Sequence, residues 1–386
     1  MIATETYTPL VNGLTVFTER LATGLAHRGH DVVVAAPSPN GHRFVEEPSR
    51  GLTIYRVRSI PTPYPQQRCA LLTRGDADGL LTDFHPDLVH IQNHFVLGRA
   101  LAQAARRRQI PAVGTNHFMP ANMLPHAPGV LLRLAPLRRG LSAALWRQFV
   151  SVYRALDAVT APSQAAAALA RAQGLRGPIH VISNGVDLMR FHPARDHFDG
   201  GGRAVRIVYV GRLDPDKEVE VLIRAMPHVV RTRRVEVVLA GRGTAERSLR
   251  RLATRLGVSE CVQFPGFVVD AQLPGLLQTA TLFVMPSPNE LQSIATLEAM
   301  ASGLPVVAAD AVALPELIED GRNGFLFPPG EARALADRIE RVLADPSRAA
   351  GMGQASRMIA EGHSLERTLG AFEALYGRLV KRSLAA

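Results

Sequence analysis

Two glutamates, Glu290 and Glu298, stand eight residues apart and form the most distinctive pattern of ionisable side chains in the sequence. On one continuous α-helix, eight residues rise by about 12 Å and the two side chains point in different directions. We therefore expect Glu290 in a loop and Glu298 in the helix that follows, with Ser293 as N-cap. Because helix N-termini bind phosphate and carboxylates accept hydrogen bonds from hydroxyls, the segment predicts a site for a sugar joined to a phosphate.

The alternative for this pair is a surface helix on which both glutamates face water. A strongly apolar run precedes the pair, and small residues follow it at Ala295, Ala299, Ala301 and Gly303. Small side chains let a helix lie close to its neighbours, so the context favours a packed, partly buried segment.

Two cations follow another apolar run, which ends at Gly211. Arg212 and Lys217 suit a diphosphate leaving group, because they neutralise the charge that grows as a sugar–phosphate bond breaks. The alternative is an ordinary solvated loop. Asp214 and Asp216 form an Asp-x-Asp pattern, but the adjacent cations already supply positive charge, so we expect no metal. We expect these acids at the N-terminus of the next helix, where they complement its dipole.

Gly241 and Gly243 follow the apolar run 235–240 and match part of a dinucleotide-binding glycine pattern. The rest of that pattern is missing. We interpret the two glycines as a tight turn between a strand and a helix.

Apolar runs typical of buried strands alternate with helical segments along the whole sequence. The strand-like runs are 31–37, 86–94, 110–118, 157–163, 205–212, 235–243, 262–267, 281–287 and 304–310. One helical segment places Phe17, Leu21 and Leu25 on one face. The alternation predicts two doubly wound, parallel-sheet α/β domains, and ligands of such sheets bind at the carboxyl ends of the strands.

A segment rich in glycine and charge marks the boundary between the halves. We predict an N-terminal domain 1–192, a linker 193–204, a C-terminal domain 205–364 and a last helix 365–386 that crosses back to the N-domain. Met1 to Thr4 leaves room for only a short first strand, which favours a start codon downstream of the ancestral one.

Composition sets broad limits on function. The 386 residues are 47% apolar and 20% charged, which is typical of a globular protein. Cys69 and Cys261 suggest neither a disulfide framework nor a zinc cluster, and we find no bilayer-spanning run and no leader, so we expect a reduced, cytoplasmic setting. The net charge of +10 favours anionic partners, although an arginine-rich genome explains it equally well. Few aromatic residues interleave with the basic ones, which makes nucleic acid the least favoured partner.

In order and spacing, these segments resemble glycosyltransferase family 4. The resemblance covers nearly the whole chain and is strongest at the Glu290–Glu298 pair. The other matching segments are 12–32, 86–92, 161–163, 183–187, 211–217, 241–243 and 263–268. The family implies the GT-B fold, with two Rossmann-like domains facing across a cleft, the N-domain binding the acceptor and the C-domain the donor. It also implies a retaining transfer of a hexose from a nucleoside-diphosphate sugar, with a UDP-sugar favoured and with no metal or other cofactor.

Carried over residue by residue, the resemblance assigns the diphosphate to Arg212 and Lys217, the ribose to Glu298 and the donor sugar to Glu290. His117 resembles a histidine that meets the donor sugar at C6, although a core histidine is the alternative. The catalytic set is thus Glu290, His117, Arg212 and Lys217. The remaining donor contacts that the resemblance implies are Gly13, Gly241, Gly243, Phe267, Val268, Gln292, Ser293 and Ile294.

One departure from the family concerns the turn after the first glutamate. Members often carry Phe-Gly there, whereas this sequence has Gln292 and Ser293, which obscures the choice of donor sugar. No nucleophilic carboxylate stands out in the N-domain. In the family the departing phosphate is one candidate for taking the acceptor's proton, so we name no general base.

The acceptor side of the resemblance points to the segment 116–156. An apolar helical stripe is formed by Leu145, Phe149 and Val152, and Arg147 lies outside this stripe. A basic segment that contains a tryptophan is able to dock on anionic lipid. The residues 117–120 also resemble enzymes that glycosylate diacylglycerol or other lipids. The alternative is a helix packed in the N-domain with a solvated basic face. The candidate acceptor or membrane contacts are Phe118, Met119, Arg138, Arg139, Trp146 and Arg147.

Three functions remain open at this point. The first is transfer of a hexose to a membrane lipid by an enzyme at the inner face of the membrane. The second is the same chemistry on a soluble acceptor, such as an aminocyclitol or another sugar. The third is a non-catalytic protein that binds nucleotide sugars, which is disfavoured because Glu290, Arg212 and Lys217 are all present.

Overall fold

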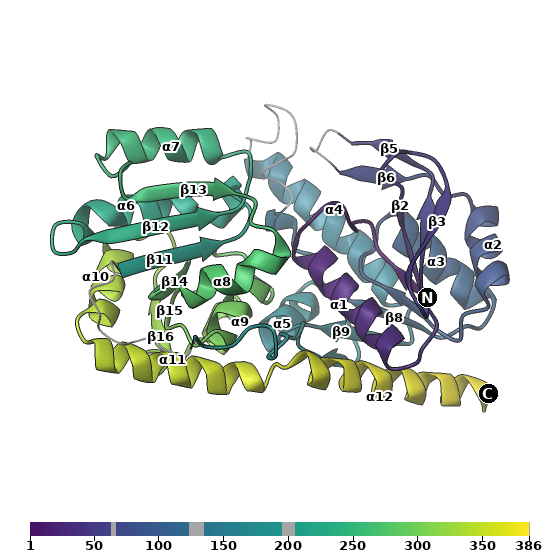
Figure 1. Ribbon diagram of the computed structural model, residues 1–386. Helices are drawn as coiled ribbons and strands as arrows, with labels where there is room; N and C mark the ends of the chain where they lie inside the picture. Colours follow the sequence, from purple (N-terminus) through teal and green to yellow (C-terminus); the bar gives the residue numbers. More distant parts are fainter. Residues whose placement is uncertain (63–66, 123–134, 195–204, 386) are drawn as a thin grey trace. The chain divides into compact units, whose positions relative to one another are not determined.

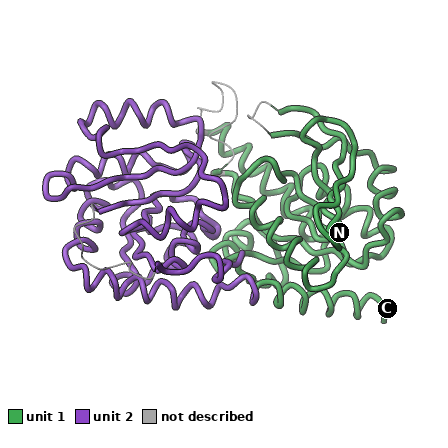
Figure 2. Tube along the Cα trace, viewed as in Figure 1, with its two compact units in different colours: residues 1–183, 368–386 green, residues 184–367 purple. Residues whose placement is uncertain are grey.

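The computed structural model describes residues 1–62, 67–122, 135–194 and 205–385 and divides the chain into two compact units (Figures 1 and 2). Unit 1 comprises Met1–Ser183 with Thr368–Ala386, and unit 2 comprises Asn184–Arg367. Each unit contains a parallel sheet with helices, which confirms the predicted α/β fold class. Most of the expected linker 193–204 lies outside the described residues.

The main sheet of unit 1 has eight strands in the order β10-β9-β8-β7-β1-β2-β4-β3. All neighbours are parallel except β3 and β4. The strands are β1 (Ile2–Ala3), β2 (Val32–Pro37), β3 (Phe44–Ser49), β4 (Leu52–Val57), β7 (Val89–Ile91), β8 (Ala112–Thr115), β9 (Ala158–Ala161) and β10 (Ile179–Val181). A separate antiparallel pair, β5 (Ser59–Pro61) and β6 (Arg68–Ala70), completes the strands of this unit.

The short first strand lies at the centre of this sheet. β1 pairs in parallel with β2 on one side and with β7 on the other, so the strand order reverses between β1 and β7. In open α/β sheets, ligands bind at the carboxyl ends of the strands beside such a reversal.

The helices of unit 1 are α1 (Gly13–His27), α2 (Arg74–Phe84), α3 (Val96–Arg107), η1 (Pro120–Asn122), α4 (Ala135–Tyr153), α5 (Gln164–Ala172) and most of α12 (Leu365–Leu384). Asn12 caps α1, because its side chain accepts a hydrogen bond from the amide of Thr15 at 2.9 Å. As predicted, Phe17, Leu21 and Leu25 are buried.

Unit 2 has a six-stranded parallel sheet in the order β13-β12-β11-β14-β15-β16. Its strands are β11 (Val205–Val210), β12 (Val235–Ala240), β13 (Val262–Gly266), β14 (Leu282–Met285), β15 (Val306–Ala309) and β16 (Gly324–Phe327). Its helices are η4 (Pro215–Lys217), α6 (Val219–Val229), α7 (Glu246–Arg255), η5 (Asp270–Gln272), α8 (Leu273–Gln278), α9 (Ile294–Ala301), η6 (Leu314–Glu316), α10 (Ala332–Leu343) and α11 (Pro346–Glu361). The reversal of strand order lies between β11 and β14.

The last helix, α12, completes unit 1 and ends near the C-terminus marked in Figure 1. A Cβ atom on Gly24 of α1 would lie 2.5 Å from Cδ1 of Leu369, so the glycine leaves room for α12. The Tyr376 hydroxyl lies 2.7 Å from Nδ1 of His90, whose Nε2 lies 2.7 Å from Oγ1 of Thr115. The helix is thus tied to the middle of the sheet.

Candidate active site

The carboxyl ends of β11 and β14 bring together the ionisable residues that the sequence singled out. Arg212 and Lys217 follow β11, and Glu290 follows β14, the neighbouring strand. The two strand ends flank the point where the strand order reverses, which is the place where open α/β sheets bind ligands.

Lys217 and Glu290 form the closest contact between these two loops. Nζ of Lys217 lies 2.7 Å from Oε1 of Glu290, and the side chains are only 13% and 14% exposed. Nζ also lies 3.8 Å from Oδ2 of Asp216. A cation and a carboxylate are therefore held side by side by separate strands.

Arg212 is held by the two aspartates of its own loop. Its guanidinium pairs with Asp214 and, at 2.8 Å, with Asp216. Asp214 also accepts hydrogen bonds from the amide and hydroxyl of Thr244, at 2.7 and 2.8 Å. As expected, these acids lie at the N-terminus of the next helix: Asp214 is the N-cap residue of the short helix η4, without a side-chain cap hydrogen bond, and Asp216 lies in its first turn. The longer helix α6 begins only after Glu218, which adopts a left-handed conformation with φ of 48°.

The aspartates are thus engaged by cations and by Thr244. Across the described ranges, no group of three or more His, Cys, Asp or Glu side chains could hold a metal ion.

The segment after β14 has the predicted local structure. Glu290 lies in the loop and Glu298 in α9, where it is buried. Ser293 is the N-cap of α9, and its hydroxyl accepts a hydrogen bond from the amide of Thr296 at 3.2 Å. The amides of Ile294 and Ala295 donate no hydrogen bond to the described residues, so they are available to an anion.

Gly241 and Gly243 have a packing reason to be glycine. A Cβ atom on Gly241 would lie 1.8 Å from the carbonyl oxygen of Gly211, and one on Gly243 would lie 2.2 Å from that of Leu213. The loop after β12 therefore presses against the loop that carries Arg212. The absence of a side chain at these two positions therefore allows the two loops to pack backbone against backbone.

The other donor candidates of unit 2 lie at the same sheet edge. Phe267 and Val268 follow β13; the Phe267 side chain is exposed, and Val268 packs against the core. Gln292 is buried in the loop after β14, and its Oε1 accepts a hydrogen bond from the amide of Asn184 at 2.6 Å. The sequence did not indicate this contact, because residues 184 and 292 are brought together only by the fold.

Of the donor candidates of unit 1, His117 follows β8, and Gly13 lies at the start of α1, beyond the loop that follows β1. Gly13 begins α1, and a Cβ atom there would meet nothing within 4 Å. His117 has Nε2 3.1 Å from Oε1 of Gln92, and its ring centroid lies 4.7 Å from that of Phe17. Burial lowers the pKa of His117 to about 3, so the imidazole is neutral at physiological pH.

Three further titratable residues of unit 1, two of them just beyond strand ends, were missed by the sequence reasoning. His90 is buried in β7, and desolvation lowers its pKa to about 3. His94 follows β7 and packs on Phe118 with ring centroids 4.5 Å apart; burial lowers its pKa to about 4. Neither ring nitrogen of His94 has a hydrogen-bond partner among the described residues.

Glu5 is the third of these residues and follows β1. Its carboxylate accepts a hydrogen bond from the amide of Leu97, and burial raises its pKa to about 7. Polar residues at successive strand ends were the available signal.

The acceptor candidates divide into buried and exposed residues. Phe118, Met119 and Trp146 are buried, and Trp146 is only 7% exposed, with its ring centroid 5.3 Å from that of Phe149. Our expectation that Trp146 contacts a lipid surface is therefore wrong. The buried stripe of α4 is Trp146, Phe149 and Tyr153, so it is displaced from the one we predicted.

The basic members of that set do face solvent. Arg138, Arg139 and Arg147 are exposed on α4, as are Leu137 and Leu141. Residues 88–156 contain nine arginines and neither Asp nor Glu. Among the described residues, no helix is long and apolar enough to span a bilayer.

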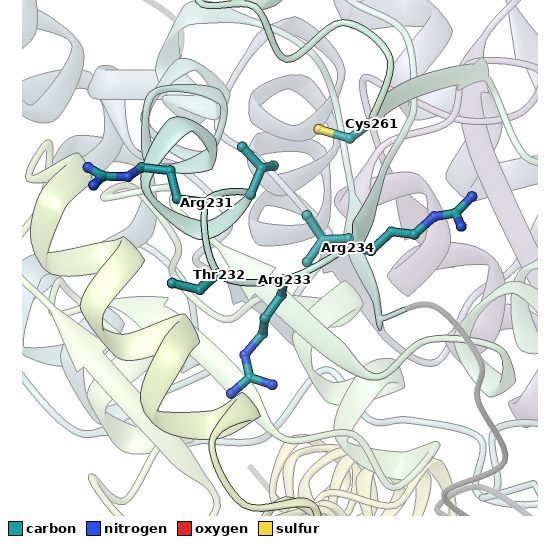
Figure 3. Close-up of a pocket in the computed structure, with 7 residues that line it drawn as sticks. Arg231, Thr232, Arg233, Arg234 and Cys261 are labelled. Atoms are coloured by element: carbon teal, nitrogen blue, oxygen red, sulfur yellow. The ribbon is translucent and has the colours of Figure 1, made fainter.

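A shallow hollow of about 500 Å³ lies elsewhere in unit 2, beside the starts of β12 and β13 (Figure 3). It is lined by Val230, Arg231, Thr232, Arg233, Arg234, Val235 and Cys261. Figure 3 shows the three arginine side chains pointing in different directions, so they do not converge on one ligand. Because strands begin here, the hollow is not part of the edge that carries Glu290.

Two family descriptions match the sequence. One, "Glycosyltransferase Family 4", matches residues 11–190, and the other, "Glycosyl transferases group 1", matches residues 204–345.

Similar proteins occur in bacteria. A GDP-mannose-dependent alpha-mannosyltransferase of Mycobacterium tuberculosis is 29% identical over 98% of this chain and 97% of its own. A lipopolysaccharide core biosynthesis mannosyltransferase of Rhizobium leguminosarum is 32% identical over 76% of this chain and 85% of its own. A solved structure, HepE of Anabaena in complex with UDP-glucose, shares the fold with a TM-score of 0.76 at 22% identity, covering 98% of this chain and 99% of that one.

Proposed function

The chain belongs to glycosyltransferase family 4, and we propose that it transfers a hexose, with retention of configuration, from a nucleoside-diphosphate sugar to a hydroxyl acceptor. Glycosyltransferase activity follows from the family; the donor, the stereochemistry and the acceptor are proposed here.

The contact between Lys217 and Glu290 carries this proposal. A nucleotide sugar has an anionic diphosphate on one side of the bond that breaks and neutral hydroxyls on the other. The ammonium of Lys217 suits the first and the carboxylate of Glu290 suits the second, and the two groups are 2.7 Å apart. The bond between sugar and phosphate then lies across this pair.

The remaining residues of unit 2 complete a donor site. Arg212 adds a second cation for the diphosphate, and the amides of Ile294 and Ala295 add hydrogen-bond donors. Glu298 takes the ribose hydroxyls. The cations oppose the charge that builds on the leaving phosphate, so they act most strongly in the transition state.

The proton of the acceptor hydroxyl goes to the departing phosphate in this proposal. The acceptor oxygen bonds to the anomeric carbon on the face that the phosphate leaves, and the phosphate oxygen takes the proton. His117 is neutral, because its pKa is lowered to about 3 by burial; it therefore holds the sugar and does not transfer a proton. No metal takes part, since Arg212 and Lys217 supply the positive charge.

Two nucleotides are candidates for the donor. The mycobacterial relative is named as GDP-mannose-dependent, whereas the Anabaena structure holds UDP-glucose at lower identity. GDP-mannose and UDP-glucose are therefore the first two donors to compare.

The acceptor is proposed to be a lipid-linked hydroxyl presented at an anionic membrane surface. The nine arginines of 88–156 supply charge for that surface, and among them Arg138, Arg139 and Arg147 are exposed on α4. The Rhizobium relative is named for lipopolysaccharide core biosynthesis. A soluble sugar or aminocyclitol acceptor is the second candidate.

The test is an assay of the purified protein with both donors, with and without vesicles of anionic lipid carrying diacylglycerol. We expect donor hydrolysis or transfer, an α-linked product from an α-linked donor, and activity that persists in EDTA. An inverted product overturns the retaining mechanism, and loss of activity in EDTA overturns the metal-free one. Transfer to soluble sugars without vesicle binding favours the second acceptor. Binding of donor without any turnover indicates a non-catalytic nucleotide-sugar-binding protein.

A further inference from the structure

Gln92 is a buried polar residue that contacts His117 at the carboxyl edge of the sheet in unit 1. It follows β7, and its backbone amide donates a hydrogen bond of 2.8 Å to the carbonyl oxygen of Ala3 in β1. Its side chain is buried, and Oε1 lies 3.1 Å from Nε2 of His117, which follows β8. Because β7 and β8 are neighbours in the sheet, their ends hold the two side chains against each other.

The other end of the Gln92 carboxamide faces the ring of His90. Nε2 of Gln92 lies 3.3 and 3.4 Å from the two ring nitrogens, which have closer partners at 2.7 Å in the hydroxyls of Tyr376 and Thr115. Burial lowers the pKa of His90 to about 3, so the ring is neutral and its single N–H is taken by one of these hydroxyls. An N–H group can rest against such a ring, whereas a carbonyl oxygen would find no hydrogen there. The carboxamide therefore turns its oxygen to His117.

This orientation decides which ring nitrogen of His117 carries the proton. A carboxamide oxygen only accepts hydrogen bonds, so Nε2 of His117 is the donor in the contact with Gln92. The imidazole is neutral, because burial lowers its pKa to about 3, and a neutral imidazole has one N–H. Nδ1 therefore carries a lone pair and can only accept a hydrogen bond. Across the described residues, Nδ1 has no partner that meets this need.

The same ring is also held by an apolar contact. Its centroid lies 4.7 Å from that of the buried Phe17, with an angle of 51° between the ring planes. His117 itself is half-buried. The contacts with Gln92 and Phe17 thus fix the direction of Nδ1, because the ring cannot turn over without losing the hydrogen bond of Nε2.

We propose that Gln92 is a positioning residue that locks His117 in the tautomer protonated at Nε2, so that Nδ1 accepts a hydrogen bond from a substrate hydroxyl. The inference rests on the proposed function, in which His117 contacts the transferred sugar. It adds a reason for the choice of group: a sugar hydroxyl has a hydrogen to donate to Nδ1, whereas the oxygens of an ionised diphosphate have none.

Nitrogen-15 NMR of protein labelled at its histidines tests the tautomer without any substrate. The chemical shift of a protonated ring nitrogen differs from that of one with a lone pair, and the signals of His117 are those missing from His117→Gln. At neutral pH we expect a protonated Nε2 and an unprotonated Nδ1 in the wild-type protein. A protonated Nδ1 overturns the proposal, and this result requires no variant of Gln92.

Two substitutions of Gln92 separate the hydrogen bond from the packing. Gln92→Met removes the oxygen at similar size, and the tautomer protonated at Nδ1 should rise from below about a tenth to about half of the population. Gln92→Glu keeps an acceptor and should retain the wild-type tautomer. If both variants keep that tautomer, Gln92 does not set it.

Thr160→Val is the matched control for damage to the sheet edge. It removes a buried hydroxyl of β9 that lies 2.6 Å from Oγ1 of Thr115, and it should leave the signals of His117 unchanged. Equal shifts in Thr160→Val and Gln92→Met would assign the effect to general loosening of the edge and would refute the proposal.

Initial rates of donor consumption show whether Gln92 acts through His117. Gln92→Met and His117→Gln should each lower kcat/KM by about tenfold, and the double variant should lose no more than the larger single loss. Losses that multiply in the double variant contradict the positioning role. A wild-type protein that turns over no donor overturns the proposed function, while the NMR measurement still decides whether Gln92 sets the tautomer.

Discussion

The carboxyl edges of the two sheets have the same topology and opposite chemistry. In each unit the strand order reverses beside the first strand, at β1 and β7 in unit 1 and at β11 and β14 in unit 2. The edge of unit 2 carries paired ions, among them Arg212, Lys217 and Glu290. The edge of unit 1 carries neutral imidazoles, at His94 and His117, against aromatic rings.

The net charge of the two units shows the opposite distribution: the unit with the neutral sheet edge carries the excess of positive charge. Unit 1 has 22 Lys and Arg residues against 11 Asp and Glu, whereas unit 2 has 22 against 23. The positive charge of the chain thus belongs to the unit whose sheet edge is neutral, and much of it is exposed on helices such as α4. Net charge describes a surface that meets anions and says little about the site where a donor binds.

Glu290→Gln should give the largest effect, because it removes a carboxylate from the ionic edge while keeping the size of the side chain. We expect turnover to fall by about a thousandfold, measured as initial rates of donor consumption. His117→Gln, at the neutral edge, is the matched comparison and should cost less. If the two variants lose equal activity, the carboxyl edge of unit 2 does not contribute more to turnover than the carboxyl edge of unit 1.

Glu298→Ala should mainly weaken donor binding, since the carboxylate is proposed to accept hydrogen bonds from the ribose. The loss is expected to be on the order of 10- to 100-fold in the affinity for free nucleotide, measured by calorimetry. Lys217→Met provides the contrast: it should lower kcat more than it lowers donor affinity. Unchanged nucleotide affinity in Glu298→Ala would refute the ribose contact.

The neutral edge of unit 1 should make the protein sensitive to acid. Burial lowers the folded-state pKa of His94 from 6.5 to about 4, so its stabilising effect is present above pH 6.5 and is lost as the pH falls through 4. His94→Phe removes this loss, and the difference should reach about 2 kcal/mol in the free energy of unfolding at pH 5. Urea unfolding between pH 4 and pH 8 measures it.

Glu5 provides an internal check on the sign of that effect. Burial raises its pKa from 4.5 to about 7, so its contribution to stability is lost as the pH rises through 7. Glu5→Gln should therefore remove a fall in stability between pH 4.5 and pH 7. A His94→Phe profile parallel to that of wild type would show that His94 is hydrated and ionises normally.

Arg138→Gln should give the smallest effect. One exposed arginine near an anionic membrane contributes about 1 kcal/mol, so binding to anionic vesicles should weaken roughly fivefold. Arg231→Gln, an exposed arginine of unit 2, is the control and should change nothing. Cosedimentation with vesicles gives both values, and equal losses would mean that the charge of unit 1 has no special role.

The sequence predicted the features that depend on neighbouring residues. The loop position of Glu290 and the cap at Ser293 follow from eight-residue spacing and cap preferences, and the structure has both. The burial of Trp146 was mispredicted, because the stripe of α4 is set by rings of other elements, such as Phe118. The contact of Asn184 with Gln292 likewise depends on strand order, which local patterns do not contain.

Several strands were missed for related reasons. β16 was missed although it is as long as β14 and β15. β3 to β6 include exposed or short strands that lack a buried apolar run. Their place in a sheet depends on pairing with strands that the sequence alone does not order. The alternation of apolar runs and helical segments predicted the fold class, and the family resemblance added the GT-B fold, whereas these elements became visible only in the structure.

The position of α12 determines the order in which the two halves of the protein can be finished during synthesis. Residues 368–386 belong to unit 1, and they bring Leu369 against Gly24 and Tyr376 to His90. They leave the ribosome after every residue of unit 2. All of unit 2 is therefore synthesised before unit 1 is complete, although most of unit 1 precedes it in the sequence. Until α12 is made, the nascent N-terminal half exposes the side chains that this helix later covers.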